Sequence, residues 1–145
     1  MTYKFLEHES EEGILGIGET KEEAFQEGAK GLFSLMAEID KIEPKKEIKI
    51  ECSASGVAEL FVEFLNELIA QKDISELLLS EFSVEIEKGK DESGETEYNL
   101  KGTAKGEKLD QEKHQVKTIV KAATYYGMKY EKKNNKHYVQ CVVDV

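Results

Sequence analysis

Residues 48–69 read IKIECSASGVAELFVEFLNELI, and the spacing of their apolar side chains changes within this one stretch. From Ile48 to Cys52 every second residue is apolar, which is the period of a half-buried β-strand. From Val57 to Ile69 the apolar residues recur every three or four positions, which is the period of an amphipathic helix with its glutamates on the solvent side. The stretch therefore predicts a strand that leads directly into a helix.

A second helix is predicted upstream by a capping signal. Thr20 followed by Glu23 is a capping-box pattern, in which the hydroxyl of the first residue and the carboxylate of the second satisfy free amides at a helix start. Apolar residues from Phe25 to Ile39 then fall on one helical face. We expect this helix to end near Asp40, ahead of the single proline.

The rest of the chain alternates with a period of two. This pattern predicts strands over residues 3–8, 13–19, 81–89, 96–105 and 116–130, and a last strand with Val139, Cys141, Val143 and Val145 on its inward side. The strands 81–89 and 96–105 are expected to pair as a hairpin, and residues 132–136 to form a turn. In 116–130 the alternation places Val120, Ala122, Tyr126 and Tyr130 inward, and Lys117, Lys121 and Lys129 outward. The sequence predicts a single α+β domain over residues 1–145, with a mixed or antiparallel sheet and two amphipathic helices.

Composition narrows the classes of partner. The 145 residues carry 20 Lys and Arg against 30 Asp and Glu, a net charge of −10, which repels phosphate backbones and anionic lipids. We therefore expect no stable direct binding to nucleic acid or membrane. The sequence lacks both an apolar run long enough for a membrane helix and the apolar core of a secretory signal, so a cytoplasmic location is expected. Cys52 and Cys141 lie far apart without zinc spacing; two buried thiols are expected, and a bridge between them stays open.

Acidic residues supply the candidate chemistry. Residues 7–12 hold five ionisable groups in one short turn, and the sequence ends on Asp144 and Val145. A solvated acidic turn is one interpretation of the first cluster. If the two regions meet in the fold, their carboxylates form an all-oxygen site for a hard cation such as Ca²⁺ or Mg²⁺. The sequence carries no glycine-rich phosphate loop and no zinc or serine-hydrolase motif.

Several motifs follow one another along nearly the whole chain. They are Leu6-Glu7-His8 with an acid at 11, Gly-x-Thr-x-Glu-Glu-Ala-Phe at 18–25, Gly-Leu-Phe-Ser-Leu-Met at 31–36, Phe-Leu-Asn-Glu-Leu at 64–68, Gly-Thr-Ala-Lys-Gly-Glu at 102–107, His114, Val-Lys-Ala-Ala-Thr-Tyr at 120–125, and the final Val-Asp-Val. Taken together and in this order, they resemble the archease family. Archeases are protein cofactors of the GTP-dependent RNA ligase of tRNA splicing, and they promote guanylylation of the ligase and its repeated turnover. The family is also linked to chaperone-like modulation of a tRNA methyltransferase.

The resemblance implies site residues. Archeases bind a divalent metal through the acid after the Leu-x-His motif, the penultimate Asp and the last residue, which correspond here to Glu11, Asp144 and Val145. It also implies functional roles for Lys121 and His8 in ligase activation. The family usually has Asp where this chain has Glu11, so we expect the longer side chain to shift the site, to weaken metal binding, or to let Glu9 or Glu12 take its place. Ca²⁺ suits ligands at a flexible chain end better than Mg²⁺, which demands stricter geometry.

Two other functions compete with ligase activation. A metal-dependent hydrolase would use the acidic cluster with His8 or His114 as its base. A holdase or adaptor would bind other proteins, such as the methyltransferase, without a role on RNA ends. Because the sequence shows no catalytic triad, we expect a non-catalytic protein. We also expect Lys121 to face solvent close to Asp144.

Overall fold

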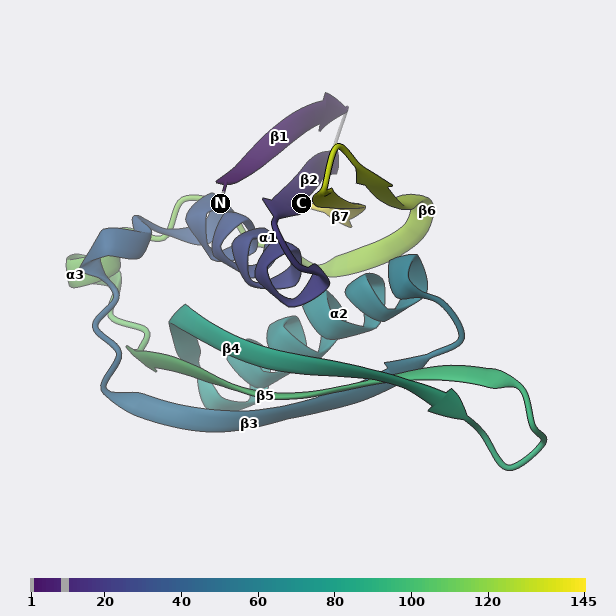
Figure 1. Ribbon diagram of the computed structural model, residues 1–145. Helices are drawn as coiled ribbons and strands as arrows, with labels where there is room; N and C mark the ends of the chain where they lie inside the picture. Colours follow the sequence, from purple (N-terminus) through teal and green to yellow (C-terminus); the bar gives the residue numbers. More distant parts are fainter. Residues whose placement is uncertain (1, 9–10) are drawn as a thin grey trace.

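A computed structural model describes residues 2–8 and 11–145. Two antiparallel sheets enclose a pair of helices in this part of the chain (Figure 1). One sheet has the order β1-β2-β7-β6, and the other has the order β3-β5-β4. The strands are β1 (Thr2–His8), β2 (Glu11–Gly18), β3 (Lys46–Ala54), β4 (Leu77–Lys90), β5 (Thr96–Lys108), β6 (Ala122–Lys133) and β7 (Lys136–Asp144). This arrangement confirms the predicted α+β class and settles the sheets as antiparallel.

The two long helices lie between the sheets. They are α1 (Lys21–Met36) and α2 (Val57–Ser75), and short turns η1 (Ile39–Lys41) and α3 (Gln111–His114) complete the helical elements of the described residues. The hydroxyl of Thr20 accepts a hydrogen bond from the amide of Glu23 at 3.0 Å, so the predicted N-cap is confirmed. The first helix ends at Met36, earlier than the predicted Asp40. Its last carbonyl accepts instead from the amide of Lys117, in the connection between the sheets.

Burial on both sides explains the wide apolar stripes of the helices. Helix α1 packs on β2 and β4, and α2 packs on β6 and β3, so each helix contacts both sheets. Close approach depends on glycine at Gly28, where an added Cβ would lie 2.4 Å from the ring of Phe61. The inward residues of β7, Val139, Cys141 and Val143, are fully buried, as predicted. No helix of the described residues is long and apolar enough to cross a membrane.

The segment 116–130 differs from its prediction in two ways. Residues 116–121 are not a strand, because this part of the chain crosses from one sheet to the other before β6 begins. Within β6 the pairing with β7 shifts between Thr124 and Lys129, and the inserted residues reverse the alternation. Consequently Ala123, not Ala122, is packed in the core, and Tyr126 is exposed although it was predicted to face inward. The predicted inward positions of Val120 and Tyr130 are correct.

The hairpins agree with the sequence. Strands β4 and β5 pair from Lys90 opposite Thr96, as predicted for 81–89 and 96–105. The β6–β7 turn has positive φ at both Asn134 and Asn135, which suits asparagine and matches the twist of a tight hairpin.

Candidate functional site

A row of residues crosses one end of the four-stranded sheet and brings the two acidic regions together. In the register, His8 lies opposite Glu11, Glu11 opposite Asp144, and Asp144 opposite Ala122. Directly opposed residues in antiparallel strands have Cβ atoms about 5 Å apart. The backbone therefore places Glu11 and Asp144 as immediate cross-strand neighbours, with Val145 following Asp144.

Lys121 joins the same end of the sheet from the other side. Its amide donates to the carbonyl oxygen of Asp144 at 2.9 Å, and its residue is exposed, one position before β6 begins. Lys121 is thus exposed and close to Asp144 as predicted, but it precedes β6 and does not lie on the polar side of a strand, as the alternation had predicted. The side chain of His8 lies outside the described part of the molecule, so only its backbone pairing with Glu11 enters the site.

Glu12 lies on the opposite face of β2 from Glu11. Side chains alternate along a strand, and Glu12 has the same parity as the fully buried Ile14. Its Oε2 atom is buried and has no hydrogen-bond partner among the described residues. Glu12 is thus a poor substitute for Glu11 beside Asp144, and the other predicted substitute, Glu9, is outside the described residues.

The donor chemistry of this row suits a hard cation. Glu11, Asp144 and the α-carboxylate of Val145, the last residue of the sequence, offer only oxygen atoms. Such ligands match Ca²⁺ and Mg²⁺, not Zn²⁺. No group of three or more His, Cys, Asp and Glu side chains within the described ranges is arranged to hold a metal. Among the described residues, Glu11 and Asp144 are therefore the two side chains at this sheet end that could contribute to a metal site.

Asn66 fixes the start of β6, a role that the sequence analysis missed. From α2, its side-chain carbonyl accepts from the amide of Ala123 at 2.8 Å, and its side-chain amide donates to the carbonyl of Ala123 at 2.9 Å. The pair of bonds imitates a strand neighbour and holds the residues next to Lys121. The sequence signal was an uncharged amide among the glutamates on the polar side of α2.

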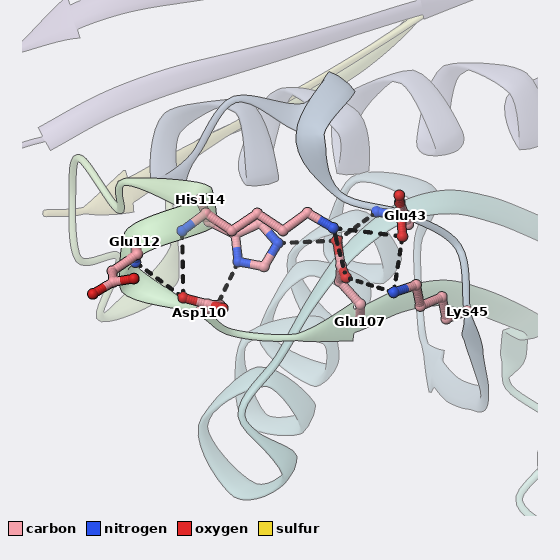
Figure 2. A network of polar contacts seen from close by, with 7 residues as sticks. Glu43, Lys45, Glu107, Asp110, Glu112 and His114 are labelled. Atoms are coloured by element: carbon pink, nitrogen blue, oxygen red, sulfur yellow. Dashed lines mark hydrogen bonds and ion pairs between the residues drawn. The ribbon is translucent and has the colours of Figure 1, made fainter.

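A polar network around the buried side chains of Glu107 and His114 fastens the connection that leads to Lys121 (Figure 2). His114 is 0% exposed, and its Nδ1 accepts from the amide of Asp110 at 2.9 Å. Since Nδ1 accepts, the ring proton sits on Nε2, which donates to Oε2 of Glu107 at 3.0 Å. Both ring nitrogens are occupied and the side chain is buried. His114 therefore cannot serve as the base of a hydrolase, as one sequence hypothesis required.

Glu107 is the centre of this network. Burial raises the pKa of its carboxyl, but hydrogen bonds from the amide of Glu43 and from Lys113 and His114 outweigh burial and hold the pKa at about 2. The Nζ of Lys113 lies 2.8 Å from Oε2, and the Nζ of Lys45 lies 3.7 Å from Oε1. The network thus ties β5, the residues before β3 and the α3 turn together through one ionised carboxylate.

The two thiols are not nucleophiles. Burial raises the pKa of Cys141 to about 12, and burial together with the charges of Glu67 and Glu63 raises the pKa of Cys52 to about 12. Both cysteines are free and lie on different sheets; Cys141 is buried as expected, whereas Cys52 is only half-buried. Thiols with such pKa values stay protonated at neutral pH, which argues against thiolate chemistry.

Comparison with known proteins gives a consistent result along the chain. The family model described as the Archease protein family (MTH1598/TM1083) matches residues 3–145. The chain is 42% identical over 130 residues to "Protein archease" of Pyrococcus furiosus, covering 90% of this chain and 88% of that protein. It is 32% identical over all 145 residues to "Protein archease" of Methanopyrus kandleri, covering 100% of both.

Solved structures share the fold. The solution structure of protein 1598 of Methanobacterium thermoautotrophicum superposes with a TM-score of 0.79 at 22% identity, covering 99% of this chain and 98% of that one. The crystal structure of a Thermotoga maritima protein, described as "an archease, possible chaperone", gives a TM-score of 0.55 at 19% identity, covering 98% of this chain and 96% of that one. Sequence and structure agree, and the chain belongs to the archease family.

Proposed function

We propose that this chain is a protein cofactor of the GTP-dependent RNA ligase that joins tRNA exon halves and other RNA ends. In this role it promotes guanylylation of the ligase histidine and so supports repeated turnover. The observation that carries the proposal is the meeting of Lys121 with the Glu11–Asp144 pair at one sheet end, in a chain that matches the family from residue 3 to residue 145.

Charge supports a protein partner. A net charge of −10 is attracted to the basic surface that an RNA-joining enzyme needs, and opposite potentials accelerate encounter between proteins. The same negative charge opposes binding of this chain to the RNA substrate of the ligase, because the RNA phosphates repel it. The occupied His114 and the protonated thiols support an accessory role over an independent hydrolase.

The cofactor that we propose is a divalent cation held by Glu11, Asp144 and the α-carboxylate of Val145, with Ca²⁺ favoured over Mg²⁺. Neighbouring carboxylates repel one another unless a cation neutralises them, and the cross-strand pairing of Glu11 with Asp144 enforces that proximity. In this role the cation fixes the end of β7 beside Lys121. The cross-strand pairing of Glu11 with Asp144 is the structural observation that supports this proposed cation site.

Calorimetric titration of the metal-stripped protein tests the cation site apart from the ligase. We expect saturable heat with Ca²⁺, weaker heat with Mg²⁺, and loss of binding in Asp144→Asn, which removes one charge at nearly constant shape. Bound metal should also raise the melting temperature by mass action. Absence of heat with both ions at millimolar concentration contradicts the site.

The ligase role is tested by measuring multiple-turnover RNA joining with and without this protein. We expect stimulation by the wild-type chain and by Lys90→Ala, a control lysine at the end of β4 in the other sheet. Lys121→Ala should fold normally, because exposed substitutions usually cost within about 0.5 kcal/mol, but should stimulate less. A chain that only suppresses aggregation of a methyltransferase, and leaves the ligase unchanged, supports the chaperone-like alternative instead.

A further inference from the structure

Two adjacent tyrosines project from the edge strand β6. Tyr125 is 51% exposed and Tyr126 is 77% exposed, although most aromatic side chains of the described residues are buried or half-buried. Isolated exposed apolar residues are common on proteins, but consecutive exposed aromatics on a sheet edge are typical of an interaction surface. Neither tyrosine takes part in the site at Lys121, so they require a separate explanation.

The backbone is shaped to present these rings. Thr124 lies opposite Val142 and Lys129 opposite Gln140, so the residues between them bulge out of the strand. Gly127 adopts φ +74°, a conformation that side chains rarely tolerate, and its carbonyl accepts from the side-chain amide of Gln140 at 3.2 Å. The bulge is therefore fixed by the local structure, and it leaves both tyrosines exposed, whereas regular alternation would turn one of them inward.

An acidic side of α2 contacts the first of the two tyrosines. The hydroxyl of Tyr125 donates to Oε1 of Glu63 at 2.7 Å, which joins β6 to α2. Glu59, Glu63 and Glu67 are spaced by four residues, so they line one side of α2, and such like charges repel one another. In the part of the chain that the structure describes, none of the three forms an ion pair with a lysine. Glu67 accepts a hydrogen bond from Gln71 and lines a hollow with Lys49 and Lys101, so Glu59 and Glu63 are the carboxylates of this side that are nearest to free for a partner's cations.

We propose that Tyr125, Tyr126, Glu59, Glu63 and Glu67 form a docking face for a protein surface rich in arginine and lysine. Because the proposal rests on the proposed function, the partner is the RNA ligase, and this face holds it while Lys121 acts elsewhere. Guanidinium groups stack on tyrosine rings and pair with carboxylates, so both components of the face recognise the same side chains. A second copy of this chain would bring a further charge of −10 against the glutamates and is the less favourable occupant.

The face supplies the centre of the interface, not its whole area. Stable complexes bury about 800 Å² on each partner, which exceeds what a pair of rings provides. A few residues, often Tyr and Arg, nevertheless carry most of the binding free energy. We therefore expect one exposed ring, Tyr126, to have a disproportionate effect on affinity.

Direct binding of the purified ligase to the full-length protein tests the docking face. In Tyr126→Ala the dissociation constant should rise about tenfold or more, as for an interface hot spot. Glu63→Gln should weaken binding and reduce its dependence on salt concentration. Ile74→Ala is the matched control, since Ile74 is 78% exposed but lies at the far end of α2, and it should bind like the wild type.

Guanylylation separates docking from activation. When the variant protein is added at a saturating concentration, Tyr126→Ala should stimulate ligase guanylylation as fully as the wild type, whereas Lys121→Ala should not. Unchanged affinity of both Tyr126→Ala and Glu63→Gln, with the wild type binding normally, overturns the docking face and leaves the proposed function intact. No binding of the wild-type chain overturns both.

Discussion

Replacing Glu107 by glutamine tests whether its ionised carboxylate stabilises the connection between the sheets. Glu107 is 7% exposed, and the pKa of its carboxyl is held at about 2, below the ordinary 4.5. A group whose pKa is lowered by folding stabilises the native state above its unfolded pKa and loses that contribution as the pH falls toward its folded pKa. The difference corresponds to about 3 kcal/mol at neutral pH.

Solvent reduces the expected effect. The side chain of Lys113 is 36% exposed, so water screens part of its attraction to Glu107. The glutamine amide, in turn, presents a donor to the donors of Lys113 and His114, which adds an unfavourable contact. We expect a loss of about 2 kcal/mol in the free energy of unfolding at pH 7.

Urea unfolding of both proteins between pH 7 and pH 3 measures this effect. Because the wild type loses its advantage as the unfolded carboxyl becomes protonated, the gap between the two proteins should shrink below about pH 4.5 and fall to less than about half by pH 3. Glu92→Gln, at an exposed carboxylate in the β4–β5 turn, is the control and should stay within about 0.5 kcal/mol of the wild type. Equal stability of Glu107→Gln and wild type at pH 7, or a gap independent of pH, refutes the reasoning.

Two further substitutions test the packing and the anchoring of β6. Gly28→Ala should destabilise the protein by about 1–3 kcal/mol in urea unfolding, because its Cβ meets the ring of Phe61 at 2.4 Å. Gly89→Ala should not destabilise the protein in this way, because a Cβ added at Gly89 has no atom within 4 Å. Equal effects at both glycines would contradict the packing argument. Asn66→Ala should cost about 1–3 kcal/mol by removing both bonds to Ala123. Hydrogen exchange at the Ala123 amide should accelerate; unchanged protection would exclude Asn66 as the anchor.

Local signals predicted most of the fold. The cap at Thr20, the apolar stripe of α2 and the asparagine turn at 134–135 each depend on neighbouring residues, and each is present in the structure. The residues of β6 that face the core could not be predicted from such local signals. Its bulge depends on pairing with β7, and Gly127 alone does not reveal how many residues are inserted.

The candidate site shows the same division between local and long-range information. The acidic character of residues 7–12 and of Asp144 is visible in the sequence, but their meeting depends on β2 pairing with β7 from opposite ends of the chain. Composition and spacing do not encode that pairing; only the family resemblance implied it. The Glu107 network was missed for a similar reason, since its carboxylate accepts from the amide of Glu43, which lies far away in the sequence.

The rate of ligase guanylylation tests the central claim, that the carboxylate row at the end of the four-stranded sheet acts on the ligase. It should be measured with the wild-type chain, with Asp144→Asn, and with a variant that carries extra residues after Val145. The extension turns the α-carboxylate of Val145 into a neutral amide and leaves the side chain of Asp144 in place. Our account predicts stimulation by the wild type and little or none by either variant, with all three equally folded by circular dichroism. Equal stimulation by all three proteins would contradict it.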